Sequence, residues 1–284
     1  MTFKVDQLWR YPVKSLVGET LEQLEFGADG AAGDRAWAVR DEVKGGIRGA
    51  RRLPGLMRCA ARYPQTPAPG PSQPAVITLP DGSTVGTLDA DVHARLSAAI
   101  GHEVTLWPLM PASDLDHYRR GPPVHEDPET EFRTLFARTA DEPLPDLSVF
   151  PEELMEFESR PGTYFDAAAV LVIASSSLAR LQRAAPESRF DVRRFRPNLV
   201  IDTGDAEGWV ERDWIGRRLR IGELELSVDI SCPRCAMTTH PFDDLPKDPK
   251  IMRTLVRENQ GDLGVYCTVT KPGIVRLGDS FEVL

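Results

Sequence analysis

The chain has 284 residues, of which 41% are hydrophobic and 27% are charged, and its formal net charge is −9. This composition is ordinary for a globular protein, and no stretch approaches the ~18 apolar residues that a membrane span requires. General nucleic-acid-binding proteins carry an excess of Lys and Arg, so the acidic balance argues against that class. We therefore expect neither a nucleic-acid partner nor a membrane partner.

The N-terminal residues, MTFKVDQLWRYPVKS, lack the basic-then-apolar pattern of a secretory signal. A cytoplasmic location is the resulting expectation. The four cysteines are too few and too unevenly spaced for a disulfide framework in a chain of this length. Thiol or metal chemistry is the better interpretation of Cys59, Cys232, Cys235 and Cys267.

The first hundred residues alternate apolar and polar side chains in short runs separated by Gly, Pro and Asp, which predicts a β-rich unit. Strands are expected at 3–9, 20–26, 35–41, 75–80, 83–88 and 103–109. The proline-rich segment 64–74 predicts a loop, because proline lacks the N–H that a sheet requires. A helix is expected from Asp89 to Ile100, with Asp89 as its N-cap and Gly101 as its stop.

Residues 110–166 are acidic and interrupted by prolines, and one amphipathic helix is expected to begin at Asp127 and Pro128. A second helix with a serine cap is expected at 175–185. Strands then return at 198–204 and in a hairpin that places Leu219 and Ile221 against the run 224–228. A helix from Asp248 and three closing strands at 264–270, 273–278 and 280–284 complete the chain.

Basic residues gather at a few places in this acidic chain. The clusters are Arg10 with Lys14, RGARR at 48–52 and RRFR at 193–196. Such clusters are most often solvated surface charge. They are also the residue types that hold an anionic ligand.

The pair Cys232 and Cys235 allows several interpretations. Zinc requires further ligands, and only His240 lies nearby. Thiol-disulfide exchange requires a helix directly after the pair, but AMTTHPF contains β-branched residues and a proline, which make a poor helix start. Two interpretations remain beside these: two buried inert thiols, or one thiolate ligand of a metal whose other ligands come from an organic cofactor.

Several motifs in order resemble the MOSC family, named after the C-terminal domain of molybdenum cofactor sulfurases, with its N-terminal β-barrel partner domain. They are YPVKS at 11–15, GDRAWAV at 33–39, RFRPNLVID at 194–202, WIGRRLRIGELEL at 214–226, CPRCAMTT at 232–239 and the closing run 264–284. The resemblance implies a β-rich α+β fold with few flanking helices. It divides the chain into an N-terminal β-barrel domain at 1–110, a connecting region at 111–160 and a MOSC domain at 161–284.

The resemblance is strongest to the amidoxime-reducing components, and it implies the following roles. Cys235 falls on the molybdenum ligand and on the catalytic position, with Cys232 as a neighbour without that role. The cofactor would be molybdenum-molybdopterin, in its plain or nucleotide form. Positions that hold the pterin and its phosphate in those relatives fall on Lys14, Ser15, Arg35, Arg196 and Asn198.

Four further residues are weaker candidates. Arg51 and Arg52 are candidates for the same pocket, although GARRLPGL departs from the family pattern there. Asp166 and Ser177 lie near cofactor-contacting positions, and they are equally well interpreted as a turn aspartate and a helix-cap serine.

The implied function is a molybdenum-dependent oxidoreductase that removes oxygen from small N-hydroxylated substrates. The chain carries no cysteine cluster for an iron-sulfur domain, so an external electron-transfer protein or reductase is expected. The alternative is a MOSC protein that binds molybdopterin, or carries sulfur on a cysteine, without reductase activity.

Overall fold

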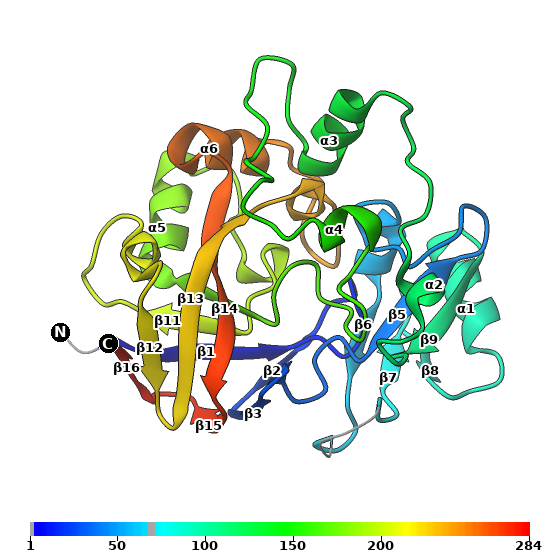
Figure 1. Ribbon diagram of the computed structural model, residues 1–284, viewed down its shortest axis with the longest axis horizontal. Coiled ribbons are helices and arrows are strands. Elements are labelled where there is room, and N and C mark those ends of the chain that lie inside the picture. The colour runs from blue at the N-terminus through cyan, green and yellow to red at the C-terminus, as the bar shows by residue number, and fades with distance from the viewer. Residues whose placement is uncertain (1–2, 68–71) are drawn as a thin grey trace.

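Strands from both ends of the sequence close into a barrel around an apolar core (Figure 1). The structure is a computed structural model that describes residues 3–67 and 72–284. The hydrogen-bonded order is β11 (Leu199–Asp202), β10 (Val170–Ala174), β14 (Asp262–Lys271), β13 (Leu224–Pro233), β12 (Arg218–Ile221), β16 (Ser280–Val283) and β1 (Phe3–Arg10), and β1 pairs again with β11. Closure leaves no barrel edge open to pairing with another chain.

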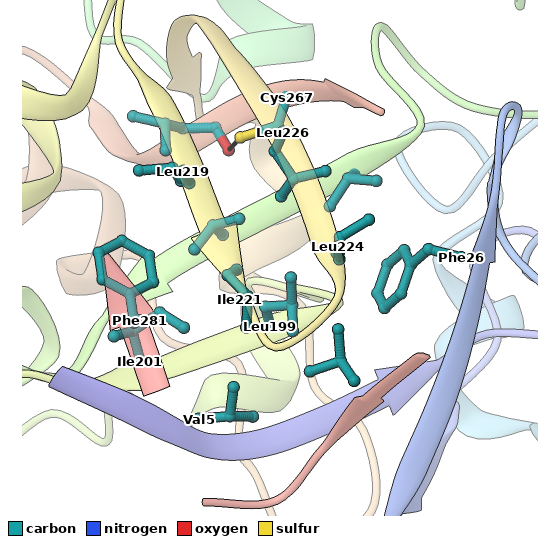
Figure 2. Packing of buried hydrophobic residues seen from close by; sticks show 14 of the residues in the cluster. Val5, Phe26, Leu199, Ile201, Leu219, Ile221, Leu224, Leu226, Cys267 and Phe281 are labelled. Atoms are coloured by element: carbon teal, nitrogen blue, oxygen red, sulfur yellow. Dashed lines mark hydrogen bonds between the residues drawn. The ribbon is translucent and has the colours of Figure 1, made fainter. Parts of the chain in front are cut away.

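The first strand of the chain therefore completes a barrel whose other strands lie between residues 170 and 283. A register irregularity between Val5 and Gln7 shifts the alternation of side chains along this strand. Val5, which Figure 2 shows, and Leu8 therefore both enter the barrel core. The predicted hairpin is confirmed: Leu219 pairs with Leu226 and Ile221 with Leu224. These apolar side chains are fully buried in the same core, where leaving water stabilises the fold.

Smaller sheets surround the barrel, and the N-terminal part supplies most of their strands. One contains β15 (Gly273–Arg276), β3 (Gln23–Gly27) and β4 (Gly30–Ala31), while β2 (Glu19–Leu21) pairs with β1. Another pairs β5 (Trp37–Asp41) with β9 (Val104–Pro108), and a third contains β6 (Ala60–Arg62), β7 (Val76–Thr78) and β8 (Thr84–Gly86). The β-rich α+β class expected from the sequence is confirmed.

Helices flank the sheets. They are α1 (Val92–Ile100), α2 (Leu115–Tyr118), α3 (Pro128–Phe136), α4 (Glu153–Glu156), α5 (Ser175–Ala184) and α6 (Lys250–Asn259), with short 3₁₀ turns η1 (Pro54–Arg58), η2 (Val192–Arg194), η3 (Val210–Trp214) and η4 (Ala236–Thr239). None of the helices in the described part of the chain combines the length and the apolar character that a membrane crossing requires.

Helix ends test the sequence-based expectations most directly. Helix α3 begins as predicted, because the Asp127 carboxylate accepts a hydrogen bond from the Thr130 N–H. Helix α1 stops at Gly101, which has a φ of 70°, but its N-cap is Asp91. The prediction of Asp89 was wrong because its carboxylate accepts instead from the Gly86 N–H, at 2.6 Å, and closes the turn before the helix.

Two other local expectations have different outcomes. The serine cap of α5 was wrong: the serines form its first turn, and the N-cap position is Ala174. In the proline-rich segment, residues 64–67 and 72–74 form no strand or helix, whereas residues 68–71 lie outside the described part of the chain.

Leu8→Ala tests whether β1 belongs to the barrel. The Leu8 side chain is fully buried in the barrel core, so truncation is expected to lower the free energy of unfolding by about 2–5 kcal/mol. The same change at Leu88, which is 69% exposed, is the matched control and is expected to shift it by less than about 0.5 kcal/mol. Urea denaturation measures both, and equal effects of the two changes would contradict the closed barrel.

Candidate functional site

Two neighbouring cavities share one wall. The larger has a volume of about 440 Å³ and the smaller about 70 Å³. The residues that line both are Asp166, Ala167, Pro233, Cys235 and Tyr266. A thiol, a carboxylate and a phenol thus lie between two chemically different spaces.

Cys235 reaches this wall because the chain leaves the barrel just before it. Strand β13 ends at Pro233, and Cys235, in an extended conformation, is the N-cap residue of the η4 turn. The segment after the pair forms this short 3₁₀ turn rather than an α-helix. Of the four cysteines, Cys235 alone is partly exposed, and the other three are buried.

Cys232 occupies a different environment from Cys235. It packs in the apolar cluster beneath α5 and α6, and the Arg234 guanidinium donates to its Sγ at 2.8 Å. Burial raises the pKa of the Cys232 thiol, against the opposing effect of the Arg234 charge. Arg234 and Arg51 both interact electrostatically with Cys235.

The small cavity is strongly basic. Arg35, Arg194, Arg196 and Arg234 all line it, with Asp166 as the acidic residue among its lining. Arg234 Nε and Arg196 Nη2 are buried and have no hydrogen-bond partner among the described residues. Unpaired buried guanidinium nitrogens are costly, and four arginines around one small cavity suit an anionic group.

Arg196 and Arg35 approach each other around one aromatic ring. Their guanidinium carbons lie 4.1 and 4.7 Å from the centroid of Tyr11, and Arg196 also donates to the Leu16 carbonyl. Burial, followed by the like charge of Arg35, lowers the pKa of Arg196 to about 10. An anion bound here would relieve this repulsion.

Asn198 lies beside the same two arginines. Its Nδ2 donates to Asp34 Oδ2 at 3.0 Å, and its Oδ1 accepts from the Leu171 N–H at 3.2 Å. Asp34 is also the ion-pair partner of Arg35. The structure therefore brings together three of the residues singled out in the sequence, Arg35, Arg196 and Asn198, on the wall of the small cavity.

Lys14 and Ser15 line neither cavity. Lys14 Nζ is buried and donates to Ser159 Oγ at 3.3 Å, to the Tyr164 carbonyl at 2.8 Å and to Asp166 Oδ1 at 2.5 Å. Ser15 Oγ accepts from the Ala50 N–H at 2.9 Å. Lys14 therefore contacts the shared wall through Asp166, and Ser15 holds the loop that carries Arg51.

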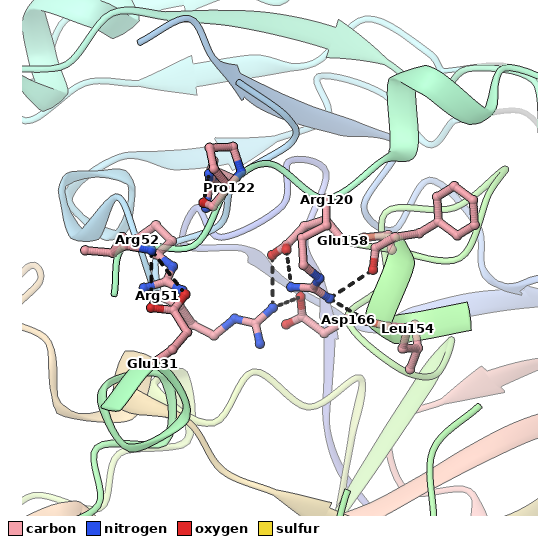
Figure 3. Close-up of polar contacts among 12 residues, drawn as sticks. Arg51, Arg52, Arg120, Pro122, Glu131, Leu154, Glu158 and Asp166 are labelled. Atoms are coloured by element: carbon pink, nitrogen blue, oxygen red, sulfur yellow. Dashed lines mark hydrogen bonds and ion pairs between the residues drawn. The ribbon is translucent and has the colours of Figure 1, made fainter. Parts of the chain in front are cut away.

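Alternating charges line the larger cavity, and Figure 3 shows the contacts among them. Arg51 lies 3.1 Å from Glu158 and 3.6 Å from Asp166, and Arg120 lies 2.6 Å from Glu158. Burial alone would raise the pKa of Asp166, but Lys14 and Arg51 outweigh it and hold the pKa well below its usual range. Although 49% of the Asp166 side chain is accessible, that residue lines both cavities, where these cations surround it.

Of the two remaining sequence candidates, one lines a cavity and the other does not. Arg52 lines the larger cavity and is paired with Glu131, whereas Ser177 lines neither cavity and donates to Glu211 at 2.5 Å. Sequence reasoning missed Arg234 and Glu158. Arg234 stood inside the quoted CPRC motif, but Glu158 had no local signal because its partners are distant in the chain.

Native thiol titration tests the environment of the cysteine pair. An aromatic disulfide reagent is expected to react rapidly with one thiol per folded, metal-free chain, because Cys59, Cys232 and Cys267 are buried. Cys235→Ser is expected to remove that reaction, and Cys232→Ser to leave it unchanged. Rapid labelling of Cys232 in the folded protein would contradict the described geometry.

Known proteins resemble the chain over nearly its whole length. Residues 2–107 match the family model of the MOSC N-terminal beta barrel domain, and residues 159–282 match that of the MOSC domain. The chain is 28% identical to mitochondrial amidoxime-reducing component 1 of Homo sapiens, over 99% of this chain and 82% of that protein. It is 26% identical to mitochondrial amidoxime reducing component 2 of Bos taurus, over 97% of this chain and 81% of that protein.

A shorter match involves a different relative. The chain is 38% identical to molybdenum cofactor sulfurase 2 of Culex quinquefasciatus, over 28% of this chain and 10% of that protein. The matched motifs, the closed barrel and the two family models agree with one another. The chain belongs to the MOSC family and carries an N-terminal MOSC β-barrel domain.

Proposed function

We propose that this chain holds a molybdenum-molybdopterin cofactor at Cys235 and reduces N-hydroxylated compounds. One observation carries the proposal: the partly exposed Cys235 lies between a basic cavity and a larger, mainly apolar one. Such an arrangement suits a thiolate ligand with an anionic cofactor on one side and an organic substrate on the other. The names of the amidoxime-reducing relatives support the same reaction.

The small cavity, at about 70 Å³, has room for one anionic group of the proposed cofactor, and its donor set fits such a group. Arg35, Arg196 and Asn198, which line this cavity, would hold that group. Cys235 would be the single protein ligand of the metal. When bound, this group supplies two-electron oxygen-atom transfer, while the chain supplies binding, orientation and electrostatics.

Lys14, Ser15 and Asp166 take supporting roles in this proposal. Asp166 accepts a hydrogen bond from the Lys14 ammonium and lies on the wall shared with Cys235. Lys14 would therefore fix the carboxylate rather than bind phosphate directly. Ser15 would position the backbone at Ala50, next to Arg51.

An external electron donor is part of the proposal. Converting an N–OH group to N–H consumes two electrons and two protons and releases one water. Those electrons must be delivered at each turnover by a separate electron-transfer protein or reductase. The division into domains at 1–110 and 161–284, joined by 111–160, also remains a prediction.

Paired serine variants test the ligand assignment. Cys235→Ser is expected to abolish molybdenum-dependent reduction of benzamidoxime, because it removes the proposed metal ligand, while Cys232→Ser keeps a good part of it. Elemental analysis, pterin analysis and turnover with a chemical reductant measure the result. Equal loss in both variants would show that the ligand is assigned wrongly, and a persulfide on Cys235 without molybdenum would favour the sulfur-carrier alternative.

Arg196→Gln tests the basic cavity. Loss of a charged hydrogen-bond donor weakens binding by about 1.5–3 kcal/mol, so bound pterin is expected to fall about tenfold or more at limiting cofactor. The same change at Arg218, whose side chain is 64% exposed, is the control. Pyrophosphate is further expected to raise the melting temperature of the cofactor-free wild type more than that of Arg196→Gln. Full pterin occupancy and an unchanged pyrophosphate response in a folded variant would count against this site.

A further inference from the structure

The apolar wall of the larger cavity comes from one stretch of the chain, residues 123–155. Its members are Pro123, Phe132, Leu135, Phe136, Leu147, Phe150, Pro151, Leu154 and Met155. The opposite side carries the arginines of 48–52 and the shared wall with Asp166 and Cys235. The cavity therefore combines an apolar wall from one stretch of the chain with charged and reactive residues from others.

Polar contacts hold this apolar wall in place. The Arg120 guanidinium donates to the Leu154 carbonyl at 2.6 Å, to the Phe157 carbonyl at 2.9 Å and to Glu158 Oε2 at 2.6 Å (Figure 3). Arg51 holds the other carboxylate oxygen of Glu158. These contacts fix the C-terminal end of the wall directly to the residues beside Cys235.

The other end of the apolar wall rests on the segment that follows Cys235. Helix α3, which supplies Phe132, Leu135 and Phe136, packs against the η4 turn. Arg52, paired with Glu131 of the same helix, ties it to the N-terminal part. The wall is thus anchored on both sides of the thiol, and Met155, which is 60% exposed, marks where the cavity opens.

We propose that the apolar wall selects the substrate, so that the protein prefers N-hydroxylated compounds with an aromatic body to small aliphatic ones. This inference rests on the proposed function. A cavity of about 440 Å³ lies in the range of small-molecule sites, which combine apolar walls with a few polar groups. The aromatic body contacts Phe150 and Leu154, and the N–OH end faces Cys235.

Two substrates of different size and polarity test the apolar wall. In the cofactor-loaded protein, kcat/KM for benzamidoxime is expected to exceed that for acetamidoxime by about tenfold or more, since each methylene in an apolar pocket is worth roughly 10- to 200-fold. Phe150→Ala and Leu154→Ala are expected to lower it about tenfold for benzamidoxime and to change it little for acetamidoxime. Val149→Ala, beside the wall but 51% exposed, is the control.

A binding measurement on cofactor-free protein separates this inference from the proposed function. Calorimetric titration is expected to give tighter binding of benzamidoxime than of acetamidoxime, and Phe150→Ala to remove most of that difference. Failure to reduce either compound with molybdenum bound would sink the proposed function, and the titration would still decide the role of the wall. Equal binding of the two compounds, or an unchanged preference in both wall variants, would overturn the inference.

Discussion

The Arg51 guanidinium lies between Glu158 and Asp166, and the cavities depend on this contact. Through Glu158 and Asp166, Arg51 joins the N-terminal match to residues on either side of the start of the MOSC domain match. Removing one member of the largely buried Arg51–Glu158 pair leaves an uncompensated charge, which costs about 3–5 kcal/mol. Arg51 therefore helps to position the end of the apolar wall relative to Cys235. The buried ion pair itself adds little to the net stability of the fold.

The stability of the fold comes from its hydrophobic clusters, of which the barrel core is one. Burial of charges is costly even when they are paired. Burial of the apolar side chains of β1, β12 and β13 in the core is favourable, because it removes apolar surface from water. This division explains why the cavities can hold unpaired guanidinium nitrogens at Arg196 and Arg234. The closed barrel supports an electrostatically unfavourable site that an anionic ligand would relieve.

Local signals predicted the fold well, and long-range contacts limited what could be predicted of the site. The hairpin around Leu219 and the Asp127 cap follow from spacing within a few residues. The prediction of Asp89 as the N-cap was wrong because its carboxylate accepts a hydrogen bond from the Gly86 N–H in the preceding turn. The role of Glu158 depends on Arg51, 107 positions away, and no periodicity encodes such a pairing. Only the resemblance brought Arg35 and Arg196 to attention together.

The same charges constrain where protons come from in the proposed reaction. Each turnover takes up two protons, and Asp166 is the acidic side chain shared by both cavities. Because Lys14 and Arg51 hold the pKa of Asp166 well below its usual range, this carboxylate stays ionised near neutral pH and accepts hydrogen bonds instead of donating protons. The proposed reaction therefore requires a proton donor other than Asp166.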